Sequence, residues 1–231
     1  MTVLVVLPGL DGTATLHSAF ADAVRAAFDS IAIISYPPDQ ILDYVALERL
    51  VRAQLPSVVP FVLLGESFSG PIALSIAANP PSNLVGVILS TTFAESPVPM
   101  FGPLASLTRF APVRAIPLSF LSWWLLGCWA TPQLEAALQN ALLAVKPAVL
   151  RSRVASALRA KALVSCRAVS LPVLYLCATN DRLLSWRAGR QISAAIAHCT
   201  TVNIAGPHLL LQAVPQACSH AVSEFASRLG R

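Results

Sequence analysis

The chain is 231 residues long, with 55% hydrophobic residues, 12% charged residues and a formal net charge of +5 at pH 7. This length can build one sizeable hydrophobic core, so we expect a single domain. No uncharged apolar run reaches the roughly 18 residues that would span a bilayer, and the first residues lack the basic opening and the cleavage site of a secretory signal. Composition therefore argues against a membrane-spanning or a secreted protein, and we expect a cytoplasmic one.

Predicted strands and helices alternate along the chain. Six short apolar runs, rich in β-branched residues, are predicted as strands at residues 3–7, 31–35, 61–64, 85–90, 172–178 and 200–204. Almost none of them alternates polar with apolar residues, which is typical of strands covered on both faces. Helices are predicted from their apolar spacing at residues 16–28, 41–55, 69–78, 188–197 and 214–229. Repetition of strand and helix predicts an α/β fold, with a mostly parallel sheet of about six strands and helices on both faces.

One segment, residues 95–167, interrupts this alternation. It opens with a proline-rich stretch, continues through the tryptophan-rich string SWWLLGCW and ends in a basic helical stretch. No long polar linker borders it, which favours an insertion within one fold over a second domain. We therefore predict a core formed by residues 1–94 and 168–231, and a small, mostly helical cap over the strand ends formed by residues 95–167.

The positive charge of the chain is concentrated in this segment. Between residues 97 and 170, eight lysines and arginines face the single acid Glu135, a balance of +7 that leaves −2 for the rest of the chain. A solvated basic face is the simplest explanation. An anionic membrane surface, a coenzyme A thioester or an acidic carrier protein would also be attracted to such a charge. No aromatic-interleaved pattern typical of nucleic-acid binding accompanies it, so no nucleic-acid partner is expected.

Cysteine spacing argues against two kinds of site. The chain has five cysteines, an odd number, and no CxxC spacing. A disulfide framework and a zinc site are therefore not expected. We interpret the cysteines as small buried apolar residues.

The string GESFSG, residues 65–70, follows one predicted strand and leads into a predicted helix. Ser67 is therefore expected at a strand-to-helix corner, in a strained turn that exposes its hydroxyl, as in a nucleophile elbow. The usual GxSxG pattern ends here in Ser69, where a small residue suffices if helix and strand nearly touch. A plain glycine-bounded turn is the alternative interpretation.

A serine nucleophile needs a base to take its proton and an acid to orient that base. His208, which ends the string GPH after the last predicted strand, is the candidate base. Asp181 follows the strand predicted at 172–178 and is the candidate acid, because serine, aspartate and histidine then occur in the chain order known for such a triad. Glu95 is a competing acid, and an acid in the position of Asp181 can also simply cap a turn.

The other three histidines are predicted to lie outside this site, because none follows a glycine turn at a strand end. We place His17 and His220 at a helix surface or a helix start, and His198 at a helix end.

A second glycine-containing loop, LPGLDGT at residues 7–13, follows the first predicted strand. It lacks the spacing of dinucleotide-binding and phosphate-binding loops. When a serine attacks a carbonyl, the oxygen becomes negative, and backbone amides aimed at that oxygen stabilise the charge. We predict that the backbone amides of Leu10 and Phe68 form this oxyanion hole.

Together, GESFSG, Asp181, GPH and LPGLDGT resemble the α/β-hydrolase fold family, over nearly the whole chain. The resemblance implies a sheet trimmed to six parallel strands, because the chain begins at what is normally the third strand. More narrowly, LPGLDGT and GESFSG are similar to motifs of small bacterial hydrolases, and of the hydrolase-like part of plant enzymes that move fatty acyl groups onto phytol and glycerol backbones.

These residues predict a serine hydrolase that cleaves carboxylic esters through an acyl-enzyme, without cofactor or metal. Two alternatives stay open. One is an acyltransferase or thioesterase acting on acyl thioesters, and the other is a catalytically silent scaffold that binds a ligand or a partner protein.

The cap segment is expected to select the substrate. Trp123, Trp124 and Trp129 are predicted to line an apolar pocket above Ser67 that suits an acyl chain or an aromatic ester. Phe101, Phe110 and Phe120 lie nearby in sequence. The alternative is that these aromatic residues form the core of the cap itself. A peripheral contact between this basic, aromatic cap and a membrane is a further prediction.

Overall fold

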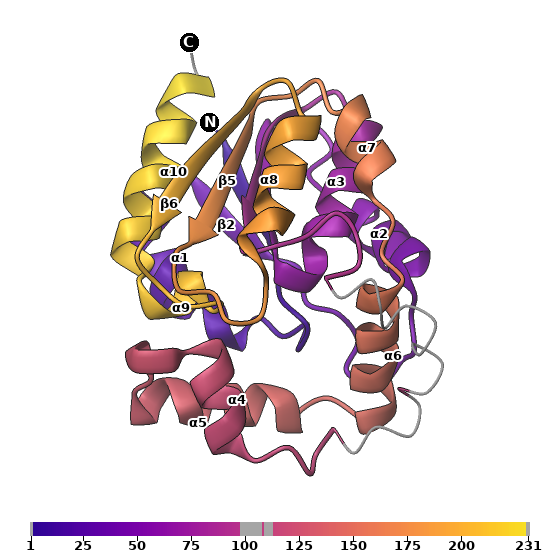
Figure 1. Cartoon of the computed structure of the whole chain (residues 1–231). Helices are drawn as coiled ribbons and strands as arrows, with labels where there is room; N and C mark the ends of the chain where they lie inside the picture. The colour runs from indigo at the N-terminus through magenta and orange to yellow at the C-terminus, as the bar shows by residue number, and fades with distance from the viewer. Residues whose placement is uncertain (1, 98–107, 109–112, 230–231) are drawn as a thin grey trace.

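The protein is built around one parallel sheet, seen in a computed structural model that describes residues 2–97, 108 and 113–229 (Figure 1). The sheet has six strands in the order β2-β1-β3-β4-β5-β6, and every neighbouring pair is parallel. The strands are β1 (Val3–Leu7), β2 (Ser30–Ile33), β3 (Phe61–Glu66), β4 (Leu84–Ser90), β5 (Val173–Ala178) and β6 (Cys199–Ile204). The predicted α/β class and six-stranded parallel sheet are confirmed.

Burial differs between the centre and the edges of the sheet. The central strands β1, β3, β4 and β5 are almost wholly buried. At the edges, β2 alternates half-buried and exposed residues, and only Ile204 of β6 is buried. The prediction that nearly all strands are covered on both faces is therefore wrong for the edge strands, because an edge strand has a neighbour on one side only.

Helices cover both faces of the sheet (Figure 1). The helices whose side chains share a hydrophobic cluster with the strands include α1 (Ser18–Val24), α2 (Tyr44–Arg52), α3 (Gly70–Ala78), α7 (Leu163–Ala168), α8 (Trp186–Ala195) and α10 (Pro215–Leu229). On one face α2, α3, α7 and α8 pack side by side, and on the other α1 packs against α10. Successive side chains of a strand point to opposite faces. Accordingly, Val5 and Leu7 lie in one hydrophobic cluster, and Leu4 and Val6 lie in the other.

Short helical turns complete the core. They are the 3-10 turns η1 (Thr15–His17), η2 (Arg25–Ala27) and η3 (Ser67–Ser69), and the helix α9 (Leu210–Ala213). The turn η3 directly follows the carboxyl end of β3, and η1 follows the carboxyl end of β1 after the loop of residues 8–14. The carboxyl edge of a parallel sheet is where side chains from several loops meet.

Between β4 and β5 the chain forms α4 (Leu118–Leu125), η5 (Gly127–Trp129), α5 (Pro132–Leu143) and α6 (Pro147–Leu158), followed by α7. Figure 1 shows α4 and α5 beyond the carboxyl ends of the strands. We refer to α4, α5 and α6 as the cap helices. In contrast, α7 packs with α3 and α8 on the sheet, and its Cys166 is fully buried in the core. Within residues 2–97, 108 and 113–229, no helix is both long enough and apolar enough to cross a bilayer.

Candidate active site

Ser67 lies at a corner between β3 and the helical turn η3, and its backbone is strained. Its φ angle is 45°, in the left-handed region that a residue with a side chain rarely adopts. Gly65, two residues earlier, shows how closely strand and helix approach here. A Cβ atom on Gly65 would lie 2.7 Å from the Cβ of Ala73 and 3.0 Å from the backbone oxygen of Ser69. The local geometry is thus that of the strained elbow expected from GESFSG.

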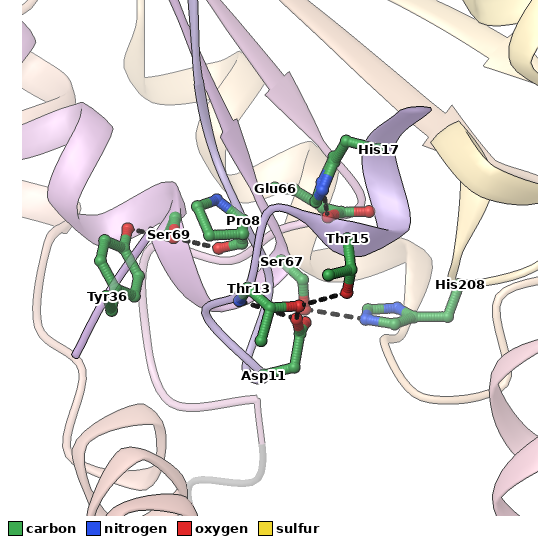
Figure 2. A network of polar contacts seen from close by, with 10 residues as sticks. All are labelled: Pro8, Asp11, Thr13, Thr15, His17, Tyr36, Glu66, Ser67, Ser69 and His208. Carbon is green, nitrogen blue, oxygen red and sulfur yellow. Dashed lines mark hydrogen bonds and ion pairs between the residues drawn. The ribbon is translucent and has the colours of Figure 1, made fainter. Parts of the chain in front are cut away.

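His208 lies in the loop between β6 and α9, and it faces Ser67. Its Nε2 is 2.8 Å from the Ser67 hydroxyl oxygen (Figure 2). The ring is buried, whereas Ser67 is half-buried. A backbone hydrogen bond of 3.0 Å from the Asn180 amide to the Gly206 oxygen ties this loop to the one that follows β5. The two segments that follow neighbouring strands are therefore held together at the same edge.

The second ring nitrogen of His208 faces Asp181. The distance from His208 Nδ1 to Asp181 Oδ2 is 2.8 Å. The other carboxylate oxygen, Oδ1, accepts hydrogen bonds from the amides of Leu183 and Leu184, each at 2.8 Å. Asp181 therefore caps a turn and faces the imidazole at once, and the turn fixes the direction of its carboxylate.

Glu95, the competing acid, lies elsewhere. It pairs with Lys161 in an isolated antiparallel bridge. Its Oε1 accepts a 3.3 Å hydrogen bond from the amide of Leu163, at the start of α7. The carboxylate that faces the His208 imidazole is therefore that of Asp181, not that of Glu95.

The loop after β1 and the elbow after β3 leave the sheet side by side, because Leu7 pairs with Gly65 in the register of these strands. Leu10 lies in a tight turn in which the Gly12 amide donates to the Gly9 oxygen at 3.0 Å. Phe68 is buried, its ring stacks on that of Tyr44 at 4.9 Å, and the Tyr44 hydroxyl donates to the Phe68 oxygen at 3.1 Å. The two predicted oxyanion donors therefore belong to adjacent, well-packed segments, and their role stays a prediction.

Ser69 has a role that the sequence pattern did not indicate. Its side chain is fully buried and its hydroxyl donates to the backbone oxygen of Pro8. The Tyr36 hydroxyl lies 2.6 Å from the same Ser69 oxygen (Figure 2). A small residue is therefore needed at this position, and a hydroxyl also ties the elbow to the loop after β1. The sequence pattern could not indicate these contacts of Ser69, because Pro8 and Tyr36 are distant from it along the chain.

The prediction for His17 is wrong as regards its exposure. His17 ends η1, but it is fully buried, and its Nε2 lies 2.7 Å from Oε2 of the equally buried Glu66 (Figure 2). Burial alone would lower the pKa of His17, but the charge of Glu66 and the hydrogen bond to it outweigh burial, so this pKa is raised. Burial alone would likewise raise the pKa of Glu66, but His17 outweighs it and the pKa is lowered. An ion pair thus lies directly behind the serine.

Two of the three tryptophans predicted to line a pocket, Trp123 and Trp124, contact Arg182 in the loop of Asp181. Trp123 is more than half exposed, and the Arg182 guanidinium lies over its ring at 4.7 Å. The Trp124 indole donates to the backbone oxygen of Arg182 at 2.9 Å, and Trp129 is half-buried in η5. A pocket role for these residues stays a prediction, and Phe101 and Phe110 lie outside the described residues.

The cap helix α4 is tied to both loops that carry the His208–Asp181 pair. The Leu209 amide donates to the Leu125 oxygen at 3.1 Å. The Arg182 guanidinium donates to the Trp123 oxygen at 2.6 Å. These bonds join the last turn of α4 to the residues that directly follow His208 and Asp181.

Solved structures of other proteins are similar to this architecture. A hydrolase from Pseudomonas aeruginosa superposes with a TM-score of 0.76 at 22% identity, covering 97% of this chain and 89% of that one. An esterase from Thermogutta terrifontis superposes with a TM-score of 0.79 at 19% identity, covering 100% and 91%. The chain has the α/β-hydrolase fold.

A third α/β-hydrolase structure, the enol-lactonase from Burkholderia xenovorans, gives a TM-score of 0.77 at 18% identity, covering 98% of this chain and 91% of that one. No protein-family model and no curated protein matches the chain. Because all three identities are low, the similarity establishes the α/β-hydrolase fold and leaves the activity to be argued from the site.

Proposed function

We propose that this protein is a serine hydrolase that cleaves carboxylic esters through an acyl-enzyme. The observation that supports this most directly is the connected series of Ser67, His208 and Asp181, with 2.8 Å between serine and imidazole and 2.8 Å between imidazole and carboxylate. Three structural neighbours described as a hydrolase, an esterase and an enol-lactonase agree with hydrolysis of an acyl bond.

In the proposed reaction, His208 Nε2 takes the hydroxyl proton while the Ser67 oxygen attacks the ester carbonyl. The resulting oxyanion is stabilised by the backbone amides of Leu10 and Phe68. His208 then returns the proton to the leaving alcohol, and the acyl group stays on Ser67. A water molecule, deprotonated by His208, attacks the acyl-enzyme and releases the acid. Asp181 holds the imidazole with Nδ1 protonated, so that Nε2 is free to accept the proton.

The primary test removes the nucleophile. We expect Ser67→Ala to lower turnover of a p-nitrophenyl acyl ester by orders of magnitude, on the scale of about a millionfold seen in a well-studied serine protease triad. A fluorophosphonate probe should label the wild type at Ser67 and leave this variant unlabelled. Ser227→Ala is the matched control, because Ser227 is exposed on α10 and its hydroxyl donates to the backbone oxygen of Glu224 in the same helix. Near-normal turnover by Ser67→Ala would refute the proposal.

The same assay separates the two candidate acids. Asp181→Asn should lower kcat by about ten-thousandfold, as loss of the orienting carboxylate does in a serine protease. Glu95→Gln, which changes a carboxylate bonded to the Leu163 amide, should leave kcat close to that of the wild type. The reverse result would assign the role of the acid to Glu95.

Product analysis and labelling address the other two functions. With a long-chain alcohol present, an acyltransferase forms the new ester in preference to the free acid, whereas a hydrolase forms the acid. A folded wild type that the fluorophosphonate does not label at Ser67 would instead favour a silent scaffold that binds a ligand. A chain-length series of acyl esters would then define the substrate.

A further inference from the structure

Arg153, on the cap helix α6, is a buried cation that donates to backbone carbonyl groups. Only 2% of its surface is exposed. Its Nη1 donates to the oxygens of Leu10 at 3.1 Å and Asp11 at 2.6 Å, and its Nη2 donates to the oxygen of Pro37 at 3.1 Å. Within residues 2–97, 108 and 113–229, no carboxylate lies within ion-pair distance of it. A charge buried in this way is costly unless its hydrogen bonds are all used.

The two carbonyls that Nη1 binds are those of the central residues of one turn. Residues 9–12 form this turn, closed by the hydrogen bond from the Gly12 amide to the Gly9 oxygen at 3.0 Å. Gly12 adopts a φ of +66°, and a Cβ atom there would lie 2.5 Å from Nη1 of Arg153. Glycine is therefore required both by the backbone and by the close approach of the guanidinium. The turn is shaped to receive this arginine.

The orientation of the Leu10 amide follows from these bonds. In a trans peptide the carbonyl and the amide point in opposite directions, so a Gly9 oxygen that faces Gly12 turns the Leu10 N–H away from the turn. Arg153 fixes the next two peptide planes by holding the oxygens of Leu10 and Asp11. The peptide plane that contains the Leu10 amide is thereby held by the Gly9–Gly12 hydrogen bond and by the peptide planes after it, which Arg153 fixes.

The surrounding contacts leave the arginine itself little freedom. Its guanidinium carbon lies 5.6 Å from the centre of the Tyr36 ring. The Tyr36 amide donates to the Gly12 oxygen at 2.8 Å, and the Tyr36 hydroxyl reaches Ser69 in the elbow at 2.6 Å. Arg153 thus belongs to the same network that joins the loop after β1 to the segment carrying Ser67.

We infer that Arg153 is a positioning residue that holds the Leu10 amide in place to stabilise the oxyanion formed during attack by Ser67. The inference rests on the proposed function. Arg153 is buried behind the turn, so it acts through the backbone and does not touch the substrate. Its loss should therefore weaken stabilisation of the transition state and leave substrate binding nearly unchanged.

The test compares Arg153→Met and Arg153→Lys with Arg159→Met in the full-length protein. Arg159 is the matched control, because it lies exposed at the end of the same helix. For Arg153→Met we expect kcat for a p-nitrophenyl ester to fall about a hundredfold, the effect that a misplacement of about 1 Å can have, with KM near the wild-type value. Arg153→Lys, which keeps a charged donor, should fall between Arg153→Met and the wild type.

A second readout reports on the oxyanion hole alone. A phenylboronic acid forms a tetrahedral adduct with a serine hydroxyl and places an oxygen where the oxyanion forms. Its affinity should fall by the same factor as kcat in each Arg153 variant and stay unchanged in Arg159→Met. A merely structural role for Arg153 would lower the melting temperature without this parallel between kcat and boronate affinity. If Arg153→Met does not fold, as judged by circular dichroism, Arg153→Lys decides.

Three results would overturn the inference. Folded Arg153 variants with wild-type kcat and boronate affinity would do so. A higher KM at unchanged kcat would also do so, because it would indicate substrate binding. The wild type is measured first: a wild type that hydrolyses no ester and is not labelled by the fluorophosphonate overturns the proposed function together with the inference. An active wild type with unaffected Arg153 variants overturns the inference alone.

Discussion

Ser67 combines two properties that oppose each other, exposure of a reactive hydroxyl and an unfavourable backbone conformation. Its φ of 45° belongs to a region that costs a residue with a Cβ atom about 1–2 kcal/mol. The neighbouring segment helps to hold this conformation, because the Thr92 hydroxyl donates to the Ser67 backbone oxygen. The strain is thus maintained by surrounding contacts, as is typical of functional sites.

This strain predicts an unusual order of stability. Ser67→Gly and Ser67→Ala both remove the hydroxyl bonded to His208, but only glycine adopts the backbone conformation without strain. Relief of about 1–2 kcal/mol exceeds the entropy that glycine loses on folding, about 0.5–1 kcal/mol. We therefore expect Ser67→Gly to be more stable than Ser67→Ala in urea unfolding. At Ser223, in the middle of α10, the same two substitutions should give the opposite order. If the alanine variant were the more stable one at both positions, the backbone of Ser67 would not be strained.

At this scale, the sequence can indicate residues that lie at strand ends, and the structure brings three of them together, with contacts from Ser67 to His208 and from His208 to Asp181. The serine follows β3, the aspartate follows β5 and the histidine follows β6. The chain order of Ser67, Asp181 and His208 suggests the role of each residue. Arg153 and Ser69 could not be assigned in this way. Their partners are backbone oxygens contributed by segments far away in the chain, and such contacts leave no pattern of residue types or spacing.

Among the elements, η1 and β3 are joined by the ion pair of His17 and Glu66, which makes stability depend on pH. The folded-state pKa of His17 is raised above 6.5, so its contribution is complete below that pH and is lost as pH rises through the raised pKa. The pKa of Glu66 is lowered below 4.5, so its contribution is complete above that pH and is lost as pH falls through the lowered pKa. The pair therefore stabilises the fold most between pH 4.5 and 6.5.

The prediction compares the wild type with the double variant His17→Gln/Glu66→Gln. A double variant is preferable, because removal of one partner alone would leave a buried charge unpaired. The difference in free energy of unfolding between the two proteins should be largest near pH 5.5 and should shrink as pH rises above 6.5 through the raised pKa of His17. Ser227→Ala, an exposed substitution on α10 that changes no titratable group, should follow the wild type at every pH. A difference that stays constant over this range would contradict the prediction.

Helix ends were harder to predict than strands. The apolar spacing predicts a helix at 41–55, but α2 begins at Tyr44, because the side chain of Asp43 accepts a hydrogen bond from the Ala46 amide at 2.8 Å and caps the helix there. The predicted helix 214–229 corresponds to α10, which starts at Pro215. The short helix α9 just before it was not predicted, since four residues are too few to show helical spacing.

For the molecule as a whole, the cysteines differ in how far the fold buries their thiols. Cys166 and Cys218 are buried, and burial raises the pKa of each thiol to about 12. Burial also raises the pKa of Cys199, to about 11. Cys177 and Cys199 are only half-buried. The expectation that all cysteines are buried is wrong for Cys128, which is exposed in the 3-10 turn η5 between the cap helices α4 and α5.

We therefore expect a single fast-reacting thiol when the native protein is titrated with Ellman's reagent, and all five thiols to react in denaturant. Cys128→Ser should abolish the fast reaction, because only the thiolate of an accessible cysteine attacks the reagent readily. Cys166→Ser is the matched control and should leave the fast reaction intact. Fast labelling that persists in Cys128→Ser would mean that the fold opens elsewhere.

The cap helices are bonded directly to three loops of the core, through Arg153 at the turn after β1 and through α4 at the loops of Asp181 and His208. A chimera that receives these helices from another α/β hydrolase would lose those bonds along with the old cap. Selectivity and turnover would then change together, and a graft would succeed only if the donor brought its own guanidinium and its own acceptor carbonyls. The molecule is for this reason a poor candidate for modular exchange, and single substitutions on the inner side of the cap are the safer route to altered selectivity.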